Sequence, residues 1–178
     1  MRYLPLTSIV LGACVANTAF ATQYLSQEQA QAVMFPDATS FKAQTLQLTL
    51  EQMQQVATLA GIPARSVAWR IVHAYKAEQL LGTIVFDEVI GKFELISYAV
   101  AFQNDASIKQ IEILAYRESH GFEIRNANWR KQFVGKTAAG GLGVGQGIAN
   151  ISGATLSCTH ITDGVRRISA IAQIALKK

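Results

Sequence analysis

The sequence has the length and composition of a single globular domain. Of its 178 residues, 50% are hydrophobic and 16% are charged, which excludes an intrinsically disordered chain, because disorder requires low hydrophobicity and high charge. The charge is uneven: residues 22–112 carry six Lys/Arg against nine Asp/Glu, whereas residues 113–178 carry nine against three. The basic second half favours an anionic ligand or an acidic partner protein. Ordinary solubilising side chains would give the same asymmetry.

Residues 1–21 have the pattern of a secretory signal peptide. Arg2 supplies the positive n-region, an apolar stretch follows, and residues 19–21, "AFA", form an A-x-A cleavage site. Polar residues interrupt the apolar stretch, which falls short of the roughly 18 residues of a membrane-spanning helix. We therefore expect an exported, periplasmic protein, for which nucleic acid is not an expected partner. The alternative is a lipoprotein, because residues 11–14, "LGAC", resemble a lipobox that would make Cys14 a lipid anchor.

Two helices are expected next in the chain, within an N-terminal helical segment over residues 22–66. Capping boxes of the S/T-x-x-Q type begin at Ser26 and at Thr49. The first helix should stop before Pro36, and the second should end at Gly61, since proline and glycine terminate helices.

From residue 67 the hydrophobic pattern changes to a period of two. Runs rich in β-branched and aromatic residues lie at 67–75, 80–86, 93–102 and 108–116, separated by short turn-prone pieces. Connections this short join antiparallel neighbours, so a four-stranded meander is expected. The alternation within residues 93–102 suggests that one face of this strand is only partly apolar and meets solvent or a ligand.

The rest of residues 67–178 completes the main domain. A short helix around residues 128–133 and a glycine-rich loop over residues 137–153 precede a C-terminal amphipathic helix. The apolar residues of this helix step by four and three: Ile161, Val165, Ile168, Ala172 and Ala175. The expected fold class is α+β: an antiparallel four-stranded meander with N-terminal helices and a C-terminal amphipathic helix.

Several familiar site motifs are incomplete. Residues 135–137, "GKT", resemble the end of a phosphate-binding P-loop, but Arg130 stands where that motif needs glycine. Cys158 and His160 are two metal ligands, whereas a catalytic zinc site typically needs three. A cysteine nucleophile with His160 or His120 as its base is a further alternative, and a small buried cysteine is the commoner explanation.

Thr155 lies in the stretch "ISGATLS", between the glycine-rich loop and the C-terminal helix. Free backbone N–H groups and the helix dipole favour a phosphate at such a position, and the small residues 152–154 would let it approach the backbone. The dipole contributes only about 0.3–2 kcal/mol, which is too little to retain a dilute cofactor. A covalent phosphoester to the threonine hydroxyl would remove that problem.

The same stretch carries a family resemblance. Residues 152–155, "SGAT", resemble the S/T-G-A-T flavinylation motif of the FMN-binding domain family, which includes flavin-carrying subunits of the sodium-pumping NADH:quinone reductase and of the related ferredoxin-oxidising membrane complex. Residues 116–136, "YRESHGFEIRNANWRKQFVGK", resemble a second block of that family, and "TDGVRRI" follows the motif. The similarity spans residues 67–171.

The resemblance implies that FMN is the cofactor and that a flavin transferase esterifies its phosphate to Thr155. It implies further that small residues shape the loop around the phosphate and that the second block lines the flavin side; these residues are Ser152, Gly153, Ala154, Glu118, Ser119 and His120. The family usually has an aspartate where this chain has Ala149. Flavinylation would therefore be slow, depend on a tolerant transferase, or be lost.

The function implied is that of an exported FMN-binding electron-transfer protein. Its redox partner would be a cytochrome or a quinone-linked membrane complex, and an acidic partner surface would suit the basic half. An electron carrier needs no acid or base, so no catalytic residue is assigned, and a carrier is favoured over an enzyme. Two alternatives stay open: a small flavin-dependent reductase with His120 or Tyr116 as proton donor, and a non-flavinylated binding module of the same fold.

Overall fold

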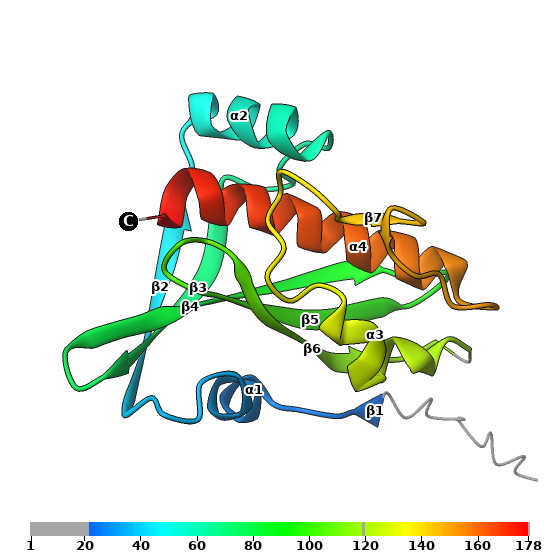
Figure 1. Ribbon diagram of the computed structural model, residues 1–178, viewed down its shortest axis with the longest axis horizontal. Helices are drawn as coiled ribbons and strands as arrows, with labels where there is room; N and C mark the ends of the chain where they lie inside the picture. The colour runs from blue at the N-terminus through cyan, green and yellow to red at the C-terminus, as the bar shows by residue number, and fades with distance from the viewer. Residues whose placement is uncertain (1–21, 119, 178) are drawn as a thin grey trace, which may run out of the picture.

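The computed structural model describes residues 22–118 and 120–177, so the expected signal peptide and Cys14 lie outside the described residues. A six-stranded antiparallel sheet in the order β1-β6-β5-β4-β3-β2 lies between helices on its two faces (Figure 1). The elements in chain order are β1 (Thr22–Gln23), α1 (Gln27–Met34), β2 (Ser40–Gln47), α2 (Leu50–Ala60), β3 (Ala68–Lys76), β4 (Gln79–Ile90), β5 (Leu95–Phe102), β6 (Ile108–Tyr116), η1 (Phe122–Arg125), α3 (Ala127–Lys131), β7 (Gly143–Val144), β8 (Gly147–Ile148), α4 (Thr155–Ile171) and η2 (Ala172–Leu176). In the described part of the chain, no helix has the length and apolar character needed to cross a membrane.

Both N-terminal helices begin at the predicted capping boxes. The Ser26 hydroxyl accepts from the Gln29 backbone N–H at 3.2 Å, and the Gln29 side chain accepts from the Ser26 N–H at 2.7 Å. Thr49 and Gln52 repeat this reciprocal pair at the start of α2. The helix α2 ends at Gly61 in the left-handed conformation, with φ of 68°, which a glycine adopts without strain. These predictions are confirmed.

The predicted meander is right for β3 to β6, but the sheet is wider than four strands. Strand β2 pairs with β3 along its whole length, and β1 pairs with the end of β6. Most side chains of β2 are exposed or half-buried, because an edge strand can leave both faces partly in water. It therefore lacks the alternating apolar pattern from which the other strands were predicted. Residues 22–66 contribute these two strands as well as two helices.

The expectation of an open face over residues 93–102 holds only at the start of that stretch, where Phe93 and Leu95 are 72% and 43% exposed. It is wrong for the rest of β5, because helices cover both faces of the sheet there. On one face, Tyr98 and Val100 are buried in a core that includes Val165 of α4 and Val56 of α2. On the other face, Ala99 is buried in a second core that includes Met34 of α1. In Figure 1, α2 and α4 lie above the sheet and α1 lies below it. The small side chains of β5 on this face, such as Ala99, therefore lie in a core shared with α1 and are not exposed to solvent.

Candidate functional site

Thr155 is the first residue of α4, not a residue ahead of the helix as the apolar stripe suggested. The first turn, with Leu156 and Thr155 exposed, has no apolar stripe of its own and so gave no helical signal. No side chain caps this helix end, and the first helical hydrogen bond runs from the Cys158 N–H to the Ala154 carbonyl at 2.9 Å. The backbone N–H groups ahead of it are available to an anion.

The small residues before Thr155 have separate physical reasons. Gly153 has φ of 81°, and a Cβ placed there would meet no atom within 4 Å, so this position needs glycine for its backbone and leaves open space beside it. Ala154 is buried against Gly121, where an added Cβ would lie 2.5 Å from the Ala154 Cβ. The motif is therefore tight on the side of residue 121 and open beside residue 153.

Tyr116 also packs against Gly121, where an added Cβ would lie 2.6 Å from its hydroxyl oxygen. Its hydroxyl donates to the His120 carbonyl and lies 3.2 Å from Ser157 Oγ. Burial raises the pKa of Tyr116, so its hydroxyl stays protonated and hydrogen-bonded. The proton-donor role that the reductase alternative gave to Tyr116 has no support in this arrangement.

A cavity of about 320 Å³ opens beside Thr155. Five of the residues predicted for the site line it: Gly153, Ala154, Thr155, Glu118 and His120. Ser152 is exposed in the adjoining turn and does not line the cavity, and Ser119 lies outside the described residues. The structure adds Lys92 and Phe93 from the β4–β5 hairpin, and Leu156 and Ser157 from α4. Segments far apart in the sequence thus meet at one end of the molecule.

Glu118 fixes the hairpin. Its Oε1 accepts from the backbone N–H of Phe93 at 2.6 Å and of Glu94 at 3.0 Å. Burial alone would raise the pKa of Glu118, but the backbone N–H groups of Glu94, Phe93 and Lys92, with the Lys92 ammonium, outweigh it and lower that pKa. The carboxylate is therefore ionised at neutral pH and serves as a positioning group for the hairpin.

The loop before the helix is held by hydrogen bonds at both ends. Asn150 Nδ2 donates to Thr155 Oγ1 at 3.1 Å, so an amide orients the threonine hydroxyl. The backbone of Ala149 is bonded twice: its carbonyl accepts from Trp129 Nε1 and its N–H donates to Gln132 Oε1, each at 2.8 Å. The Ala149 side chain is exposed. The position where the family usually has aspartate thus lies at the surface.

Residues 91–170 match the model of the FMN-binding domain family. The chain carries an FMN-binding domain. The matched range contains every residue that lines the cavity, so the expected resemblance is confirmed. No curated protein matches the chain. Among solved structures, the crystal structure of NqrC from Shewanella oneidensis is similar at 16% sequence identity and a TM-score of 0.48, over 82% of this chain and 83% of that chain.

The cavity of the FMN-binding domain fits the two ends of that cofactor. The uncapped start of α4 and the open space at Gly153 suit a phosphate. Phe93 and Leu156, which are 72% and 47% exposed, offer apolar contacts to a ring system. The volume of the cavity lies at the lower end of the range for ligand pockets, which is roughly 300–1,000 Å³. Part of a bound FMN would therefore stay accessible from outside.

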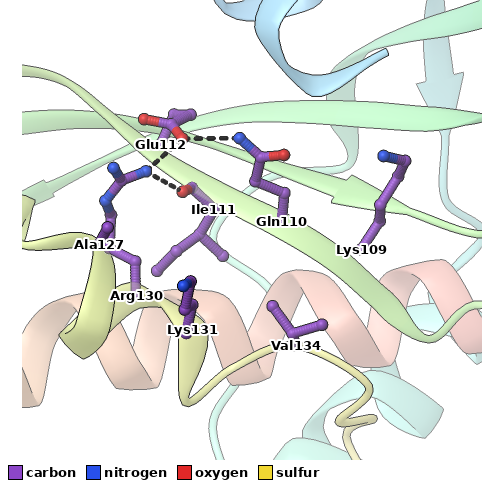
Figure 2. Close-up of a pocket in the computed structure, with 8 residues that line it drawn as sticks. All are labelled: Lys109, Gln110, Ile111, Glu112, Ala127, Arg130, Lys131 and Val134. Atoms are coloured by element: carbon purple, nitrogen blue, oxygen red, sulfur yellow. Dashed lines mark hydrogen bonds and ion pairs between the residues drawn. The ribbon is translucent and has the colours of Figure 1, made fainter. Parts of the chain in front are cut away.

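A partly buried ion pair holds α3, the helix that carries Trp129, against β6. Glu112 pairs with Arg130 and also accepts from Gln110 Nε2 at 2.7 Å, while Arg130 Nη1 donates to the Ile111 carbonyl at 2.7 Å (Figure 2). These groups line a second cavity of about 330 Å³, on the β6 side of α3. Since Trp129 and Gln132 bond to Ala149, this ion pair also fixes the loop that presents Thr155.

The cysteine alternative finds no support. Cys158 is fully buried, and burial raises the pKa of its thiol, so it lacks the thiolate that a nucleophile requires. His160 Nδ1 lies 2.6 Å from the Ile90 carbonyl, to which it donates. Cys158 therefore serves as a small apolar residue, and His160 ties α4 to the end of β4.

Proposed function

We propose that this protein is an exported electron-transfer protein that carries FMN through a phosphoester bond to Thr155 Oγ1. The observation that carries the proposal is the place of this hydroxyl: exposed, at the uncapped start of α4, in the wall of a cavity inside an FMN-binding domain. When bound, the flavin would supply the redox chemistry, and the protein its attachment, orientation and electrostatic environment.

The residues of the chain divide this work. The N–H groups of the first turn of α4 hold the phosphate, and Asn150 orients the acceptor hydroxyl before attachment. The packing of Ala154 against Gly121 keeps the helix start in place. A flavin transferase acts on the exposed loop, and an electron-transfer partner, such as a cytochrome or a quinone-linked membrane complex, approaches the open side of the cavity.

Intact mass measurement tests this function. The chain would be produced with an exported flavin transferase, as wild type, as Thr155→Ala and as Thr159→Ala, a control that removes the next threonine hydroxyl of the same helix. We expect wild type and Thr159→Ala to gain the mass of FMN minus one water and to stay yellow after denaturation, and Thr155→Ala to gain nothing.

Other outcomes would point elsewhere. An unmodified, colourless wild type would contradict the proposal and favour a binding module without flavin. A mass gain from FMN in Thr155→Ala would show that the flavin is attached to another residue. Steady turnover of an organic acceptor, abolished by His120→Ala, would favour a reductase, because the exposed His120 lines the cavity.

A further inference from the structure

The tip of the β4–β5 hairpin, residues 91–94, places an exposed aromatic side chain in the wall of the cavity that Thr155 also lines. Phe93 is 72% exposed and lines the cavity, as does Leu156, which is 47% exposed and follows Thr155 in α4. Single exposed apolar side chains are common on protein surfaces. Two large ones on the same cavity, beside a predicted attachment point, indicate a surface that a ligand covers.

Hydrogen bonds hold the backbone of the hairpin tip, although its side chains are exposed. Glu118 binds the N–H groups of Phe93 and Glu94, and the Gly91 N–H donates to the Glu94 carbonyl at 2.7 Å. His160 holds the preceding residue, Ile90, through its carbonyl. A Cβ at Gly91 would lie 2.5 Å from Glu118 Oε1, so the turn is packed directly on that carboxylate. A backbone held in this way loses little conformational entropy when a ligand binds.

Lys92 adds positive charge at the same place. Its ammonium nitrogen lies 4.8 Å from the centroid of the Phe93 ring, within the range of a cation–π contact. An aromatic ring has two faces, so this contact leaves one face of Phe93 free for another planar group. Lys92 itself lines the cavity.

We infer that Phe93 and Leu156 hold the isoalloxazine ring of the FMN attached at Thr155, and that Lys92 supplies positive charge at the edge of that ring. This inference rests on the proposed function, and it assigns ring-binding residues to a hairpin that the sequence did not connect with the motif. A cation near the ring stabilises the added negative charge of a reduced flavin more than the oxidised form. Lys92 therefore raises the midpoint potential.

The access of solvent to the flavin tests whether Phe93 and Leu156 contact the isoalloxazine ring. In the flavinylated protein, acrylamide quenching of flavin fluorescence would be measured for wild type, Phe93→Ala, Leu156→Ala and Phe122→Ala. Phe122 is a matched control, because it is 59% exposed and does not line the cavity. We expect the quenching constant to rise severalfold for Phe93→Ala and Leu156→Ala and to stay at the wild-type value for Phe122→Ala.

The midpoint potential of the flavin tests whether the Lys92 ammonium acts on the ring. Lys92→Gln should shift it to a more negative value, whereas Lys131→Gln, which changes an exposed lysine of α3 at the second cavity, should leave it unchanged. Flavin attached at Thr155 with unchanged quenching in both apolar variants and an unchanged potential in Lys92→Gln would overturn the inference alone. A wild type that carries no flavin would overturn the proposed function and the inference together. Intact mass separates these two results.

Discussion

The exposed side chain of Ala149 stands in the acceptor loop where proteins with an FMN-binding domain usually have aspartate. Its backbone is bonded to Trp129 and Gln132 whatever the side chain is, so aspartate fits there without moving the loop. We expect Ala149→Asp to be flavinylated faster than wild type at limiting transferase, measured as a time course of intact mass. Ala139→Asp, which adds the same charge at another exposed alanine, is the control. Equal rates in all three proteins would show that the carboxylate is dispensable.

Glu118 is the residue whose charge the hairpin depends on. Since its folded-state pKa is lowered, the ionised carboxylate stabilises the fold above its ordinary pKa of about 4.3, and this contribution is lost as the pH falls through the lower folded value. We expect Glu118→Gln to have a smaller free energy of unfolding than wild type at pH 7, with the difference shrinking in acid. Urea denaturation over a pH series measures this.

Glu123→Gln removes an exposed carboxyl of η1 and is the control for that series. Its difference from wild type should stay small across the range. A deficit of Glu118→Gln that is the same at every pH would mean that the hydrogen bonds of residue 118 do not depend on its charge.

Among the elements, α4 lies so close to the sheet that Gly164 has no room for a side chain. A Cβ there would be 2.2 Å from the Tyr98 hydroxyl oxygen, and that hydroxyl is buried and donates to Asp87 Oδ2 at 2.6 Å. In an open helix Gly→Ala would stabilise by about 1 kcal/mol. Here overpacking costs about 1–3 kcal/mol, so we expect Gly164→Ala to lower the free energy of unfolding, as measured by urea denaturation.

Measuring Gly164→Ala in the Tyr98→Phe protein separates the steric clash with the Tyr98 hydroxyl from the effect of helix propensity. In Tyr98→Phe the hydroxyl is absent, so Gly164→Ala should cost less there than in wild type, and the coupling between the two changes should be measurable as a double-mutant cycle. A Gly164→Ala variant that is more stable than wild type would show that α4 can move away from β5.

The elements also show how far the sequence could predict this fold. Capping boxes and apolar periods are local, so α1, α2, β3–β6 and the buried stripe of α4 could be predicted from them. Strand β2 could not, because its hydrogen bonds to β3 depend on pairing and not on an apolar face. The start of α4 at Thr155 was missed for a similar reason, since its first turn exposes both Thr155 and Leu156.

At the scale of the whole molecule, the site depends on topology. The motif around Thr155 could be predicted from its letters, whereas Phe93 and Lys92 reach it only because the meander returns the β4–β5 hairpin to the end of the sheet where β6 and α4 meet (Figure 1). The hydrogen bonds of Trp129 and Gln132 to the Ala149 backbone could not be predicted either, because these residue types are common in short helices. Residues distant in sequence carried no local signal for a shared cavity.

The basic half of the chain sets the choice of redox partner under the proposed function. Residues 113–178 carry nine Lys/Arg against three Asp/Glu and contain the acceptor loop. Opposite charge steers association, and salt screens it over about 10 Å at 0.1 M. We therefore expect the flavinylated, reduced protein to transfer electrons to an acidic cytochrome faster than to a basic one at low salt, with the difference narrowing as salt rises. Stopped-flow absorbance measures both second-order rate constants.

Arg117→Glu reverses an exposed charge next to Glu118, close to the cavity. It should slow the reaction with the acidic cytochrome at low salt more than Lys76→Glu, which reverses an exposed charge at the end of β3. The reason is that a charge near the flavin acts on the productive encounter, whereas a distant one acts only on the net charge. If the two variants slow the reaction equally, net charge alone directs the encounter and the partner does not dock at the open side of the cavity.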